Sequence, residues 1–200
     1  MVADGRIDVA PERFPGWLQA LLDEHPGAMV EPDGSTIAVR WDGGMARCER
    51  FPHDPLGIVL VRRGGYAVGL GVGARLVASK AGRRHVQSRT AAGGWSQQRY
   101  ARRRAGQAQV LVDAVAGHAA GVLLGGEHPR PAGLVVGGDR ALVAQVLADR
   151  RLTGIPDVPR REVAGLPDPD AAVLSRALWL GRAVRVTLGQ TPADEVPEGP

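Results

Sequence analysis

Apolar residues near the start of the chain recur at helical spacing. Within residues 11–25 they share one face of a predicted α-helix: Phe14, Trp17, Leu18, Leu21 and Leu22. Two strand-like segments follow at residues 36–41 and 45–51, and the Asp42-Gly43-Gly44 sequence between them is typical of a tight hairpin turn. The pattern predicts a small helix-and-hairpin extension over residues 1–55, which ends in a linker at residues 51–55.

Three apolar segments come next in quick succession, at residues 57–63, 66–72 and 74–80. Gly64-Gly65 lies between the first two and predicts a tight hairpin, so we expect a meander of three strands. Residues 84–88 are a candidate for a short fourth strand. From about Ser96 to Val122 the spacing becomes helical, and one face carries a line of small and aliphatic residues: Ala101, Ala105, Ala108, Leu111, Val115, Ala119 and Val122.

Helical and strand-like patterns alternate over the rest of the chain. We expect strands at residues 133–136, 162–164 and 183–188, a helix at 139–148 with Asp139 as its N-cap, and a helix at 170–180. A strand meander followed by this alternation predicts an α/β fold, with a mixed sheet covered by helices in a ribonuclease-H-like topology. This main domain is expected over residues 56–188, and the Pro- and acid-rich residues 189–200 are expected to be disordered.

The charged residues are distributed unevenly along the chain. The 58 residues between Asp54 and Asp113 contain no acid and eleven cations, whereas the rest of the chain has 14 cations against all 21 acids. Such a segment favours a polyanionic partner, because each phosphate that a cation neutralises releases a counterion. An arginine-rich composition explains why arginine outnumbers lysine, but it does not explain the missing acids. The segment therefore predicts a nucleic-acid partner.

Composition excludes several other classes of protein. Cys48 is the only cysteine, which excludes an intrachain disulfide and a cysteine-rich zinc site. No apolar run approaches the roughly 18 residues that span a bilayer, and the N-terminus has neither the basic segment nor the apolar core of a signal peptide. These features predict a cytoplasmic protein without membrane association, and we expect it to be a monomer.

Common cofactor and metal motifs do not account for the basic segment. Gly69, Gly71 and Gly73 imitate a dinucleotide-binding loop, but a strand is expected after them where that motif requires a helix. Tight turns or close strand packing explain these glycines better. The five histidines are not spaced as metal ligands, and the acidic cluster that holds magnesium in ribonuclease-H-like nucleases is missing. We therefore expect neither a metal nor a cofactor.

The remaining candidate site is the segment Gly93-Gly94-Trp95-Ser96-Gln97-Gln98. One interpretation is structural: a glycine turn, with Ser96 as the N-cap of the next helix and the glutamines exposed in its first turn. The other is functional, because an exposed tryptophan can stack on a base and a glutamine amide can orient a water or a ribose hydroxyl. On a helix, Arg99, Arg102 and Arg103 would share one face beside this segment, where they can bind phosphates.

The sequence around this segment resembles a known family. The string KAGRRHVQSRTAAGGWSQQRYARRR, residues 80–104, is closely similar to actinobacterial Vms-like release factors, and the similarity extends to RRGGYAVG at 62–69 and GGDR at 137–140. These proteins are relatives of the eukaryotic Vms/ANKZF peptidyl-tRNA hydrolases and of the catalytic domain of class-1 release factors. The family's Gly-x-x-Gln signature corresponds to Gly94-Trp95-Ser96-Gln97, whereas ordinary release factors have Gly-Gly-Gln.

The resemblance implies a metal-independent hydrolase of peptidyl-tRNA that acts in the peptidyl-transferase centre of the large ribosomal subunit, in ribosome rescue and quality control. Gln97, with Gln98 as the alternative, would position the attacking water, and Gly93 and Gly94 would allow close approach to RNA. The residues implied in RNA binding are Trp95, Lys80, Arg83, Arg84, Arg89, Arg99, Arg102, Arg103 and Arg104.

Because no separate codon-reading domain is visible in 200 residues, we expect release to be independent of the codon. Two other functions stay open at this point. One is a non-catalytic module that binds rRNA or tRNA through the same basic surface. The other is a nuclease that cleaves tRNA.

Overall fold

The computed structural model describes residues 5–83, 96–155 and 157–190, with the backbone alone for residues 96–105. The chain is an α/β protein that divides into two compact units. The first unit combines Met1–Pro52 with Arg182–Pro200, and the second is His53–Gly181. Each unit contains one five-stranded sheet, so the predicted α/β class is confirmed.

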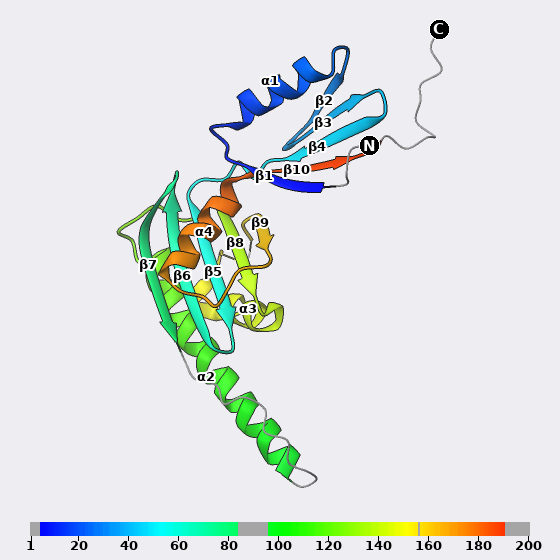
Figure 1. Cartoon of the computed structure of the whole chain (residues 1–200). Coiled ribbons are helices and arrows are strands. Elements are labelled where there is room, and N and C mark those ends of the chain that lie inside the picture. Colours follow the sequence, from blue (N-terminus) through cyan, green and yellow to red (C-terminus); the bar gives the residue numbers. More distant parts are fainter. Residues whose placement is uncertain (1–4, 84–95, 156, 191–200) are drawn as a thin grey trace. The chain divides into compact units, whose positions relative to one another are not determined.

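The first unit is an antiparallel sheet in the order β1-β10-β4-β3-β2. Its elements are β1 (Gly5–Val9), α1 (Phe14–Glu24), β2 (Met29–Asp33), β3 (Thr36–Trp41), β4 (Gly44–Glu49) and β10 (Val184–Gly189) (Figure 1). The apolar face of α1 packs on Val39, Ala46 and Cys48, which are fully buried. Burial raises the pKa of the Cys48 thiol to about 11, because the charged thiolate is poorly solvated there.

The predicted helix and hairpin of this unit are confirmed. Strands β3 and β4 pair with Trp41 opposite Gly44, and Gly43 takes a positive φ of 79° in the turn between them. Strands β1 and β2 were not expected from the sequence. The position of β10 differs from the sequence-based expectation. Residues 183–188 were expected in the main domain, but β10 pairs with β1 and β4 of the first unit. Alternating valines define a half-buried strand but not the sheet that it joins.

The second unit is a mixed sheet in the order β7-β6-β5-β8-β9. Strands β5, β6 and β7 form an antiparallel meander, and β8 and β9 run parallel to β5, as the predicted mixed sheet requires. The elements are β5 (Leu56–Arg62), β6 (Gly65–Val72), β7 (Arg75–Arg83), α2 (Ser96–Leu124), β8 (Gly133–Gly138), α3 (Arg140–Leu147), the 3-10 turn η1 (Arg150–Leu152), β9 (Arg160–Val163) and α4 (Ala171–Arg182).

Helices cover both faces of this sheet. Buried residues of α2 and α3, including Leu111, Val115 and Val146, pack against Val59 and Val68 on one face. On the other face α4 lies close to the strands because Gly69 and Gly71 leave room for it. A Cβ at Gly71 would overlap the side chain of Leu178 on α4. The glycines that imitate a cofactor loop therefore serve helix packing, and Gly73 forms the turn that follows with a φ of 55°.

One segment in the described part of the chain is long and apolar enough to cross a membrane, judged by length and composition alone. It is Gly106–Leu124 of α2, although the sequence was expected to hold no such run. Leu111, Val115, Ala119 and Leu123 of this segment are buried against the sheet. The need to fill this core accounts for its apolar composition.

Gly138 holds the ends of β5 and β8 together. The backbone N–H of Asp139 donates to the carbonyl oxygen of Val61 at 2.7 Å, and the Asp139 side chain accepts from the N–H groups of Ala141 and Leu142, which confirms the predicted N-cap. At Gly138 φ is 99°, a conformation that favours glycine, and a Cβ would overlap the Val61 oxygen.

The substitution Gly138→Ala is therefore expected to lower the free energy of unfolding by about 2–4 kcal/mol, from backbone strain and overlap together. Urea denaturation of both proteins measures this difference. Gly64→Ala is the matched control, because Gly64 lies in the turn after β5 with open space around it and no positive φ. Equal losses of stability in the two variants would contradict the role given to Gly138.

Candidate functional site

The site predicted from the sequence lies at the start of α2, a helix of 29 residues and thus about 43 Å long. Among the residues of α2 whose side chains are described, those between Ala108 and Leu123 make the apolar contacts with the core of the sheet. The N-terminal part of α2 extends past the end of the sheet (Figure 1). We call residues 96–105 of this helix the arm.

The structure places the predicted site residues in three groups. The arm carries both glutamines and four arginines: Gln97, Gln98, Arg99, Arg102, Arg103 and Arg104. The edge strand β7 carries Lys80 and Arg83, whose side chains are exposed. The other predicted residues lie outside the described part of the chain: Arg84, Arg89, Gly93, Gly94 and Trp95.

Helix geometry determines what the start of the arm can offer a ligand. Since α2 begins at Ser96, Gln97 and Gln98 both lie in its first turn, where backbone N–H groups have no partner within the helix. The helix dipole adds partial positive charge at the same point. Successive positions of an α-helix are about 100° apart around its axis, so Gln97 and Gln98 occupy different faces of the backbone helix. Positions 99, 102 and 103 are three or four residues apart and therefore share one face.

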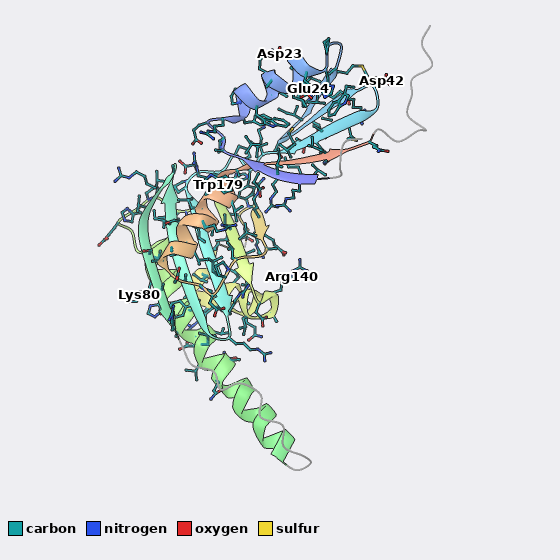
Figure 2. The ribbon with its side chains drawn as sticks, in the orientation of Figure 1. Asp23, Glu24, Asp42, Lys80, Arg140 and Trp179 are labelled. Atoms are coloured by element: carbon teal, nitrogen blue, oxygen red, sulfur yellow. The ribbon has the colours of Figure 1, made fainter. Side chains whose placement is uncertain are left out.

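Strand β7 is the element that precedes α2 along the chain. It is an edge strand of the sheet, it contains no acidic residue, and it ends at Arg83. Figure 2 shows Lys80 on the outer side of β7. Residues 84–95, which we call the tip segment, therefore follow the end of β7 and precede the start of α2. Cations are present on both of these elements.

Tyr66 joins β7 to α2 and was not predicted as a site residue. Its ring stacks on His118 of α2 with centroids 5.3 Å apart, and a Cβ at Gly82 would come within 2.7 Å of its hydroxyl oxygen. The ring thus lies over the backbone of β7, one residue before the strand ends. This contact fixes the end of β7 relative to α2. His118 is thus packed against an aromatic ring of the sheet.

Folding also neutralises part of the acid-free segment, which the sequence alone did not reveal. Arg62 donates to the carbonyl oxygen of Leu166 at 2.6 Å and lies 3.6 Å from the carboxylate of Asp168. Arg63 lies 4.0 Å from the carboxylate of Asp139. Two of the eleven cations are therefore next to acids that are distant in sequence. Lys80 and Arg83 on β7 are exposed, and the arm adds four arginines in sequence, so these two elements are the candidates for binding a polyanion.

Among the residues that the structure describes, no group of three or more His, Cys, Asp and Glu side chains is arranged to hold a metal ion. The described elements of the site are the N-terminus of α2 and the exposed cations of β7, and the sequence adds the amides and arginines of the arm. Chemically, this set can bind phosphate groups and can orient a polar group by hydrogen bonds.

A mixed sheet with helices on both faces and a basic helical arm is consistent with a release-factor-like α/β domain. The profile of the family described as "Actinobacteria/chloroflexi VLRF1 release factor" matches residues 54–187, which are 134 of the 200 residues. The chain therefore belongs to this family, as the sequence resemblance predicted. The match includes β7, the tip segment and all of α2. No curated protein matches the chain.

Proposed function

We propose that this protein hydrolyses the ester that joins a nascent peptide to its tRNA, in the peptidyl-transferase centre of the large ribosomal subunit. The observation that supports the proposal is that Ser96 and Gln97, the last two residues of the Gly-x-x-Gln signature, begin a helix whose first part extends past its own sheet. Such an arm can carry a small tip into a narrow RNA site while the bulk of the domain stays outside. Membership of a release-factor family supports the proposal.

The proposed reaction needs a correctly placed water more than it needs an acid or a base from the protein. Water adds to the ester carbonyl carbon, the bond to the ribose oxygen breaks, and a proton passes to that oxygen, leaving a free peptide and intact tRNA. Favourable orientation alone can contribute about 7–11 kcal/mol in ideal intramolecular cases. The neutral amide of Gln97 does not take up a proton at pH 7, so its role is to orient the water.

Backbone N–H groups at the start of α2 have the second role in the proposed reaction, which is to stabilise negative charge. The first N–H groups of the helix lack partners within it, and they can donate to the oxygen that becomes negatively charged as water adds. The dipole of α2 acts in the same direction. The arginines of the arm, together with Lys80 and Arg83, would bind phosphates of rRNA or tRNA.

We further propose that release is independent of the codon and that it serves ribosome rescue in the cytoplasm, with the protein acting as a monomer. The test uses the full chain and large subunits that carry peptidyl-tRNA, with both free peptide and tRNA length followed in time. We expect free peptide and full-length tRNA. Tight binding with an intact ester would favour an RNA-binding module, and shortened tRNA would favour a nuclease. A requirement for a stop codon in whole ribosomes would contradict codon independence.

A further inference from the structure

A pocket of about 230 Å³ lies between strand β7 and the C-terminal end of α2. Its walls are Ala78 and Ser79 of β7, residues 121 and 122 in the last turn of α2, and residues 125–128 of the loop that follows this helix. Figure 1 shows this loop beside β7. The pocket is at the opposite end of α2 from the arm, and the proposed release reaction does not use it.

The size of the pocket suits a single side chain. Its volume of about 230 Å³ is several times the roughly 30 Å³ that one water molecule occupies in the liquid. It is smaller than the roughly 300–1,000 Å³ of typical cofactor and small-molecule sites. Gly121 leaves the space open, because a Cβ there would meet no atom within 4 Å. Ser79, Gly121 and residues 125–128 are exposed, so a group from another molecule can enter.

The lining of the pocket favours a positive charge. Since α2 ends at Leu124, the carbonyl groups of its last turn lack partners within the helix, and they carry the negative end of the helix dipole. The last turn contains no basic residue that would balance them. Glu127 adds a full negative charge, and it forms no ion pair with any residue that the structure describes. Neither lysine nor arginine is among the residues that line the pocket.

The position of the pocket separates it from the site that the tip would enter. Gly121 lies about 38 Å along α2 from Ser96, at 1.5 Å per residue. A group in the pocket is therefore remote from the two glutamines. Phosphate is also unsuited to the pocket, because the Glu127 carboxylate and the carbonyl end of α2 repel an anion.

We propose that this pocket binds an arginine side chain presented by a partner protein. The guanidinium would donate to the Glu127 carboxylate and to carbonyl oxygens in the last turn of α2, and its flat face can stack on the His128 ring. Arginine fits better than lysine because its five donors have a fixed planar arrangement. The proposal goes beyond peptide release and does not depend on it.

The test titrates the full chain with Nα-acetyl-arginine methylamide and follows the backbone amide resonances of the protein by NMR. We expect saturable shifts at residues 79, 121 and 125–128, with a dissociation constant on the order of millimolar. The citrulline analogue has nearly the same shape without the charge and should leave these resonances unchanged, and the lysine analogue should bind more weakly. Absence of shifts with the arginine probe, or equal shifts with the citrulline analogue or with inorganic phosphate, would overturn the proposal.

Two pairs of variants locate the binding. Glu127→Gln keeps the shape of the side chain and should weaken binding of the arginine probe by about tenfold. Its control is Asp157→Asn, which removes an exposed charge of the second unit outside the pocket. Gly121→Leu fills the pocket and should abolish the shifts, whereas Gly106→Leu makes the same change elsewhere on α2, where a Cβ also meets no atom. Unchanged affinity in either pocket variant, or an equal loss in its control, would contradict an arginine site here.

Discussion

Replacing Gln97 by alanine is expected to slow peptide release by about 10²-fold, the loss that misplacing a reacting group by about 1 Å can cause. Affinity for the large subunit should stay unchanged, because a neutral amide contributes little to binding phosphates compared with the arginines beside it. Single-turnover release at saturating protein measures the first quantity, and sedimentation with large subunits at several protein concentrations measures the second.

Two matched variants make this result specific. Gln98→Ala removes an identical side chain from the adjacent position of the same helix, and adjacent helical positions are about 100° apart around the axis. Gln107→Ala removes a glutamine from α2 beyond the arm, where it should leave release unaffected. Loss of release in Gln98→Ala with normal release in Gln97→Ala would reassign the role to the second glutamine. Normal release in both would contradict an amide-positioned water.

Replacing Arg102, Arg103 and Arg104 by glutamine is expected to weaken binding to large subunits by on the order of 10²–10³-fold, because each would lose a charge-assisted contact with a phosphate. The slope of log affinity against log salt should become shallower by about 2–3, since fewer counterions are released. Titrations at a series of salt concentrations measure both effects. At saturating protein, release should recover, because these arginines act on location and not on the chemical step.

The control for this variant removes the same charge from elsewhere in the second unit. Arg130, Arg150 and Arg176 are all exposed and lie outside the arm and β7. Their replacement by glutamine lowers the net charge equally and should leave the salt dependence nearly unchanged. If both triple variants lost the same affinity, then overall charge, and not a defined basic arm, would be responsible for binding.

Much of the second unit was predictable from local patterns. The turn at Gly64-Gly65, the switch to helical spacing at Ser96 and the Asp139 cap each depend on residues close in sequence, and the structure confirms them. The same holds for the hairpin at Asp42-Gly43. Strand β2 was missed because its sequence, MVEPD, has little apolar alternation and all of its residues are exposed.

Pairings between distant segments were not predictable in the same way. The alternation of Val184 and Val186 identifies a strand, but a free sheet edge near it in space decides where that strand goes, and β10 therefore joins the first unit. Similarly, nothing near Arg62 in the sequence indicates that the Leu166 carbonyl and Asp168 will lie beside it. These contacts depend on loop closure across about a hundred residues, which local propensity does not encode.

By itself, the sequence determined the Gly-x-x-Gln signature, the acid-free segment around it and the family that both indicate, because these are properties of residue types and their spacing. The tertiary structure alone decided that Ser96 and Gln97 begin a helix whose first part extends past the sheet, and that Arg62 and Arg63 lie beside acids that are distant in sequence. The physical reason is that local residue preferences determine where a helix begins and ends. Which part of that helix packs on a sheet depends on elements that are distant in sequence.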